Sequence, residues 1–69
     1  MGKNRDRLSI IAAVLEAANS GASKSHIKTN ANLSFSVLEK YLNVVEGAGF
    51  VRAEGTKFEL TGRGREFLK

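Results

Sequence analysis

Cysteine is absent from this 69-residue chain, and histidine occurs once, as His26. The missing cysteines exclude a disulfide scaffold, a cysteine zinc site and a thiol nucleophile. One histidine is too few to hold zinc without cysteine partners, so we expect neither a metal nor a cofactor. We expect His26 on the surface, in the first turn of a short helix.

Long apolar stretches are equally scarce. The longest lies around residues 10–14 and falls far short of the ~20 residues that span a membrane. Residues 1–7 are polar, and no apolar segment of the signal-peptide kind follows them. We therefore expect a cytoplasmic protein with no membrane partner and no secretory signal.

The acidic residues are few and scattered. Seven Asp and Glu are dispersed along the chain, and no serine has a credible base beside it. The composition, with 42% hydrophobic and 26% charged residues, is that of a small globular protein. We predict a single domain over residues 1–69 that is not an enzyme.

Basic residues outnumber acidic ones. Eleven Lys and Arg against seven Asp and Glu give a net charge of +4. The basic residues cluster in three places: Lys3, Arg5 and Arg7; Lys24 and Lys28; Arg63, Arg65 and Lys69. A small basic domain favours a polyanionic partner, with nucleic acid ahead of an anionic membrane surface.

Apolar spacing predicts two helices in the first half of the chain. Between Asp6, as N-cap, and a stop at residues 19–21, apolar residues recur every three or four positions, as on one face of a helix. Ser23 precedes a shorter predicted helix over Lys24–Ala31, in which Ile27 is the single apolar anchor. A turn at residues 30–32 follows, because asparagine tolerates the left-handed conformation.

A third helix is predicted over about 34–48, with Ser34 as N-cap and Gly49 in the left-handed conformation after the last turn. One face of this helix is apolar, and Val37 and Val44 lie at its edges. Its members are Leu38, Tyr41, Leu42, Val45 and Ala48.

Extended structure is predicted for residues 50–53 and Lys57–Leu60, with a glycine-containing hairpin turn at residues 54–56. Thr61 is the expected N-cap of a last short helix, whose apolar contacts are Phe67 and Leu68. Three helices, a β-hairpin and a short helix make up the plan of a winged helix-turn-helix, an α+β fold that is mostly α.

The sequence from Arg7 to Leu68 carries a family pattern. Its residues are Ile10, Ile11 and Leu15; residues 21–27 (GASKSHI); residues 32–35 (NLSF); Leu38, Tyr41 and Leu42; residues 49–51 (GFV); residues 58–61 (FELT); and Gly64, Phe67 and Leu68. In this pattern the chain resembles the small archaeal winged-helix DNA-binding proteins, a group of transcription regulators and chromatin-associated proteins.

This resemblance implies double-stranded DNA as the partner and association with the nucleoid. It also implies that the helix over about 34–48 enters the major groove. Members of the group often continue into a long dimerising helix, and this chain stops at Lys69. We therefore expect any homodimer to use the first or the last helix.

Candidate DNA-binding residues fall into three groups. The outer face of the third helix is expected to read bases, a basic flank to hold phosphates, and the hairpin to contact phosphate or the minor groove. The groups are Ser34, Phe35, Ser36, Glu39, Lys40 and Asn43; Arg5, Arg7, Lys24 and Lys28; and Arg52 and Lys57. The alternative for the helix face and the hairpin is that their side chains are exposed to solvent and contact no DNA.

The aromatic residues of the third helix have separate interpretations. We expect Phe35 to be a core anchor between the second and third helices, with contact to a thymine methyl or a sugar as the alternative. Tyr41 falls on the apolar face and is expected in the core.

Two rival functions remain open. A winged-helix module that docks a protein partner needs a sizeable exposed apolar patch in place of a basic face. A binder of single-stranded nucleic acid needs several exposed aromatic residues, and only Phe35 is a candidate.

Overall fold

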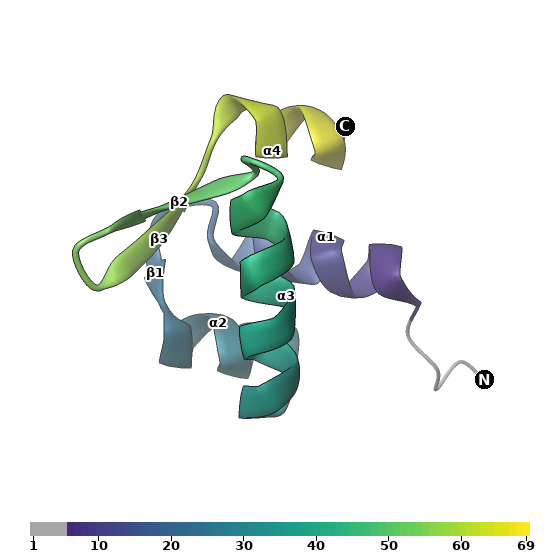
Figure 1. Cartoon of the computed structure of the whole chain (residues 1–69), viewed down its shortest axis with the longest axis vertical. Helices are drawn as coiled ribbons and strands as arrows, with labels where there is room; N and C mark the ends of the chain where they lie inside the picture. Colours follow the sequence, from purple (N-terminus) through teal and green to yellow (C-terminus); the bar gives the residue numbers. More distant parts are fainter. Residues whose placement is uncertain (1–5) are drawn as a thin grey trace.

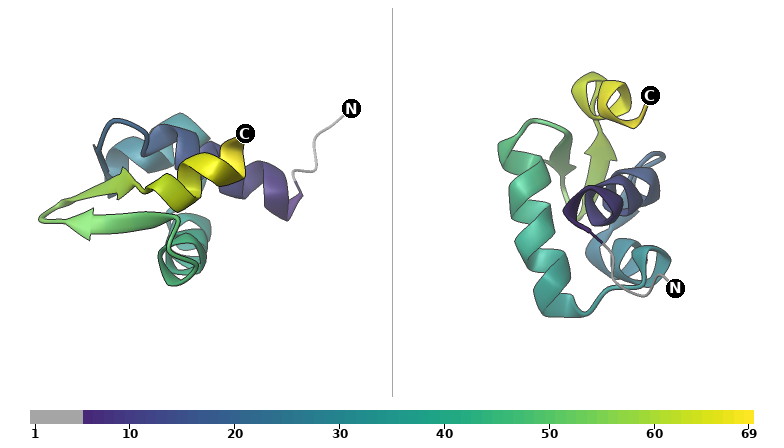
Figure 2. Two further views of the ribbon diagram at one scale, coloured as in Figure 1. Left: turned by 90° about the horizontal axis from the view of Figure 1, so that it is seen from above. Right: turned by 90° about the vertical axis from the view of Figure 1, so that its right-hand side faces the viewer.

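The computed structural model describes residues 6–69, which form four helices and a three-stranded sheet. The helices are α1 (Arg7–Ala17), α2 (Lys24–Ala31), α3 (Phe35–Gly47) and α4 (Gly62–Leu68). The strands are β1 (Ala22–Ser23), β2 (Val51–Glu54) and β3 (Lys57–Leu60). α1 packs against the other three helices, and the β2–β3 hairpin projects away from them (Figures 1 and 2). No helix within residues 6–69 is long and apolar enough to cross a membrane.

All four helices begin at an N-cap residue: the sequence predicts Asp6, Ser34 and Thr61, and the structure adds Ser23. In every case the side-chain oxygen of the cap accepts a hydrogen bond from the backbone amide three residues later, which satisfies one of the unpaired amides of the first turn. The pairs are Ser9 to Asp6 (2.8 Å), His26 to Ser23 (3.3 Å), Val37 to Ser34 (3.3 Å) and Gly64 to Thr61 (3.1 Å).

α3 ends in the left-handed turn predicted at Gly49, whose φ is +81°. The amide of Phe50 donates to the carbonyl of Val45 (2.8 Å), and the amide of Gly49 donates to that of Glu46 (3.0 Å). This pair of bonds is the Schellman motif. α2 ends in a similar way at Asn32, which has a φ of +57° and confirms the predicted turn.

The sheet has the antiparallel order β1–β3–β2. β2 begins one residue later than predicted, because the Phe50 amide completes the end of α3. The hairpin turn is correspondingly shorter, with Gly55 and Thr56 between the strands and a φ of +63° at Gly55. The sequence does not predict β1, whose two residues pair with Phe58 and Lys57 of β3.

The core forms where α1, α2 and α3 meet the sheet. Among the most buried side chains are Val14, Leu15, Ile27, Leu38, Val45 and Val51. Tyr41 is buried, as predicted, and Val37 and Val44 lie at the edge of the core. Ala48 is exposed, contrary to prediction, because α3 ends at Gly47 and the chain turns away from the helical path.

α4 closes one end of the molecule, as Figure 1 shows. The rings of Phe67 and Phe50 pack with their centroids 5.0 Å apart, and Leu68 packs against the core. Both predicted apolar contacts of this helix are thereby confirmed.

Candidate nucleic-acid interface

The outer face of α3 carries three exposed polar side chains, Ser36, Lys40 and Asn43. They lie opposite the buried face that includes Leu38 and Leu42. The sequence predicts this division of the helix, and the burial confirms it. The Lys40 ammonium lies 5.8 Å from the centroid of the Tyr41 ring, so the lysine side chain runs along the surface of the neighbouring aromatic.

Phe35 is 52% exposed, so the expectation that it anchors the core is wrong. It occupies the first position of α3, where its ring stays at the surface. Ile27 of α2 and Leu38 of α3 are fully buried instead. A large apolar ring therefore stands on the solvent side of the helix start.

Lys24 and Glu39 join α2 to α3 through an ion pair. Lys24 Nζ lies 2.7 Å from Glu39 Oε2, and the two side chains are 43% and 41% exposed. The same ammonium lies 6.0 Å from the centroid of the Phe35 ring. The sequence predicts both charged residues in the interface but does not predict that they pair. Fifteen positions separate them, and only the packing of α2 on α3 brings them together.

The β2–β3 hairpin forms the wing, and its charges cancel. Its two basic residues, Arg52 and Lys57, are balanced by Glu54 and Glu59. Arg52 Nη2 lies 3.5 Å from Glu59 Oε1, directly across the strand pair, and Arg52 Nε lies 3.9 Å from Glu54 Oε2. Arg52 is therefore shared between two carboxylates on the surface of the wing.

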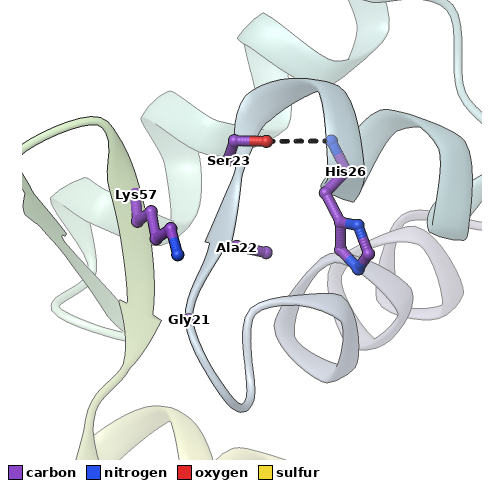
Figure 3. A pocket seen from close by; sticks show the side chains of 5 residues that line it. All are labelled: Gly21, Ala22, Ser23, His26 and Lys57. Carbon is purple, nitrogen blue, oxygen red and sulfur yellow. Dashed lines mark hydrogen bonds between the residues drawn. The ribbon is translucent and has the colours of Figure 1, made fainter.

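A solvent-open hollow of about 290 Å³ lies between the wing and the start of α2 (Figure 3). It is lined by Gly21, Ala22, Ser23, His26 and Lys57. His26 is exposed in the first turn of α2, as predicted, and its Nε2 lies 2.8 Å from Asn30 Nδ2. Lys57 forms no ion pair within residues 6–69 and brings a basic side chain to the lining of the hollow.

The remaining predicted phosphate-binding residues are distributed over two helices. Arg7 is exposed at the start of α1, and Lys28 is half-buried in α2. Neither forms an ion pair within the described part of the chain. Arg5 lies outside the described residues. The hydroxyl of Ser34 accepts the Val37 amide as the cap of α3 and lies 3.5 Å from Ser36 Oγ.

Within residues 6–69, no group of three or more His, Cys, Asp or Glu is placed to hold a metal ion.

Comparisons with known proteins agree with this architecture. The winged helix-turn-helix family model matches residues 4–69. No curated protein matches the chain. The crystal structure of Sso10a-2, a DNA-binding protein from Sulfolobus solfataricus, superposes with a TM-score of 0.82 and 19% identity, covering 93% of this chain and 72% of that chain. At this identity the likeness concerns the fold, which is the one that the sequence predicts. The chain belongs to the winged helix-turn-helix family.

Proposed function

We propose that this protein binds double-stranded DNA, with α3 in the major groove. The observation that carries the proposal is the exposed row of Ser36, Lys40 and Asn43 on the helix that follows the turn of the helix-turn-helix. In this motif the second helix reads base edges with its outward face. The similar fold of Sso10a-2, which is described as a DNA-binding protein, supports the same function.

The dimensions and chemistry of α3 suit the groove. Its 13 residues make a rod about 20 Å long. The rod lies along the major groove, which is roughly 12 Å wide and admits the cross-section of an α-helix. Lysine contacts guanine edges or phosphates, and asparagine pairs with the N6 and N7 atoms of adenine. Lys40 and Asn43 therefore supply direct contacts to bases.

We assign phosphate binding to basic side chains that take no part in the ion pairs of the wing. Arg7 and Lys28 have no acidic partner within residues 6–69 and can each neutralise one phosphate. Lys57 adds a charge beside the hollow, whereas Arg52 is tied to two glutamates. Arg5 belongs to the same predicted flank.

The cellular role of the protein depends on how strongly it prefers one DNA sequence over another. A transcription regulator needs a clear preference for its site, and a chromatin-associated protein needs broad coverage of DNA. We propose one of these two roles. Competition between a selected duplex and a scrambled one decides between them.

The test is a titration of random duplex DNA at several salt concentrations. With about four phosphates neutralised per chain, log affinity is expected to fall with log salt at a slope of about −3 to −4, since bound cationic groups release counterions. A flat response to salt, or no binding at low salt, contradicts the proposal and favours a protein-docking module.

A further inference from the structure

Glu39 is an acidic residue on the surface that we assign to DNA. The phosphates of a duplex repel a carboxylate that faces them. The Glu39 side chain therefore lowers the sequence-independent affinity for DNA. Ser36, Lys40 and Asn43, which lie around Glu39 on this side of α3, are polar or basic, and a second acidic residue, the exposed Glu46, follows two turns later with no ion pair within residues 6–69. Glu39 therefore calls for a role other than phosphate binding.

The ion pair with Lys24 leaves part of this carboxylate open. Lys24 Nζ contacts Oε2 at 2.7 Å, and Oε1 accepts no hydrogen bond from residues 6–69. A carboxylate has about four acceptor sites, so one lysine does not exhaust it. Lys24 thus offsets the charge and restrains the side chain, which is 41% exposed, while Oε1 keeps its acceptor sites free of partners within residues 6–69.

An acceptor at this place discriminates among bases. In the major groove, cytosine presents an amino donor, and carboxylate side chains accept from it. Guanine and thymine present acceptor oxygens, which repel a carboxylate, and adenine places its N7 acceptor beside its amino group. Cytosine, which presents an amino donor, is therefore the base that best matches the Glu39 carboxylate.

The exposed Phe35 ring lies one helical turn before Glu39 and shares Lys24 as a neighbour. Residues four apart lie on the same helix face, with Cβ atoms about 5–6 Å apart. An apolar ring there suits the 5-position edge of a pyrimidine better than the N7 acceptor of a purine. We propose that Glu39, held by Lys24 and flanked by Phe35, selects cytosine at one position of the DNA site. This inference rests on the proposed DNA binding.

The test is selection of bound duplexes from a randomised pool by the wild type, Glu39→Gln and Glu46→Gln. Glu46 is exposed on the same helix and forms no ion pair within residues 6–69, so its variant removes one negative charge in the same way. Both variants are expected to bind random duplex more tightly than the wild type, because each removes repulsion from phosphates.

Base preference separates the two variants. Wild type and Glu46→Gln are expected to enrich cytosine at one position. Glu39→Gln is expected to change that preference by about tenfold, toward adenine, since glutamine pairs with N6 and N7. Equal melting temperatures show that the folds are intact.

Two outcomes overturn the inference while the proposed function stands. One is a Glu39→Gln protein that keeps the wild-type preference, which makes the ion pair purely structural. The other is a wild type that binds duplex DNA but enriches no cytosine. If the wild type binds no duplex at all, the proposed function itself fails.

Discussion

A Cβ atom on Gly64 would overlap the backbone carbonyl oxygen of Phe50, so α4 sits directly on the junction between α3 and β2. Thr61 reinforces this junction: its amide donates to the same carbonyl at 2.9 Å, and its hydroxyl contacts the carbonyls of Gly49 (2.6 Å) and Phe50 (3.0 Å). The end of α3 and the start of α4 are thus held at one point.

Gly64→Ala is expected to destabilise the protein by about 1–3 kcal/mol, because the added methyl group forces α4 away from the junction. The matched control is Gly47→Ala, where an added Cβ meets no atom within 4 Å. That change is expected to stabilise the protein by up to about 1 kcal/mol through helix propensity. Urea unfolding measures both values. Equal effects of the two substitutions would contradict the close approach.

Thr61→Val is expected to cost about 1–2 kcal/mol, since it removes the N-cap of α4 and the hydroxyl contacts to the α3–β2 junction. Thr61→Ser keeps the hydroxyl and is expected to retain most of the stability. Thermal or urea unfolding of the two variants provides the comparison. A valine variant as stable as the serine variant would show that the hydroxyl is dispensable.

Leu42→Ala is expected to lower the free energy of unfolding by about 2–5 kcal/mol, because Leu42 is almost fully buried on the core face of α3. Lys40→Ala, on the opposite face, should leave the melting temperature nearly unchanged. The two substitutions measured side by side check the phase of the helix. A harmless Leu42→Ala would be incompatible with the packing described above.

Asp6 is expected to make stability depend on acid pH. The backbone amide of Ser9 donates to its carboxylate, which lowers the pKa of Asp6 below its ordinary value of 3.8. A group whose pKa falls on folding stabilises the folded state above its unfolded pKa, and this contribution is lost as the pH drops below 3.8 toward the folded-state pKa.

Melting temperatures across pH 2–7 check the Asp6 prediction. Asp6→Ala should lower the melting temperature at pH 7 and weaken its acid dependence. Asp6→Asn should preserve the cap, because asparagine caps helices well, but lose the titration. An alanine variant with an unaltered acid dependence would argue against this cap.

Asn43→Ala is expected to weaken binding to a preferred duplex by about 1–3 kcal/mol and to leave random duplex almost unaffected, because base edges differ with sequence. Arg7→Ala is expected to weaken both equally and to reduce the salt slope by about one unit, since phosphates are the same everywhere. Competition titrations of each variant measure these effects. Equal losses on both duplexes from both variants would indicate non-specific coating.

Residues close together in the chain are enough to predict the four helices, most of their caps and the face of α3 that enters the core. Asp6, Ser34 and Thr61 cap their helices at the predicted positions, and Gly49 takes the predicted left-handed turn. These features depend on residues within a few positions of one another. Local spacing is therefore enough to predict them, and with them the order of elements in a winged helix.

Other features arise only when elements that are far apart in the sequence pack together. β1 consists of two residues and exists because β3 lies beside it. Phe35 is at the surface because Ile27 and Leu38 are the residues buried from α2 and α3. The pairing of Lys24 with Glu39 likewise arises where α2 crosses α3. None of these contacts leaves a periodic trace in the sequence, because each depends on how separate elements pack in space.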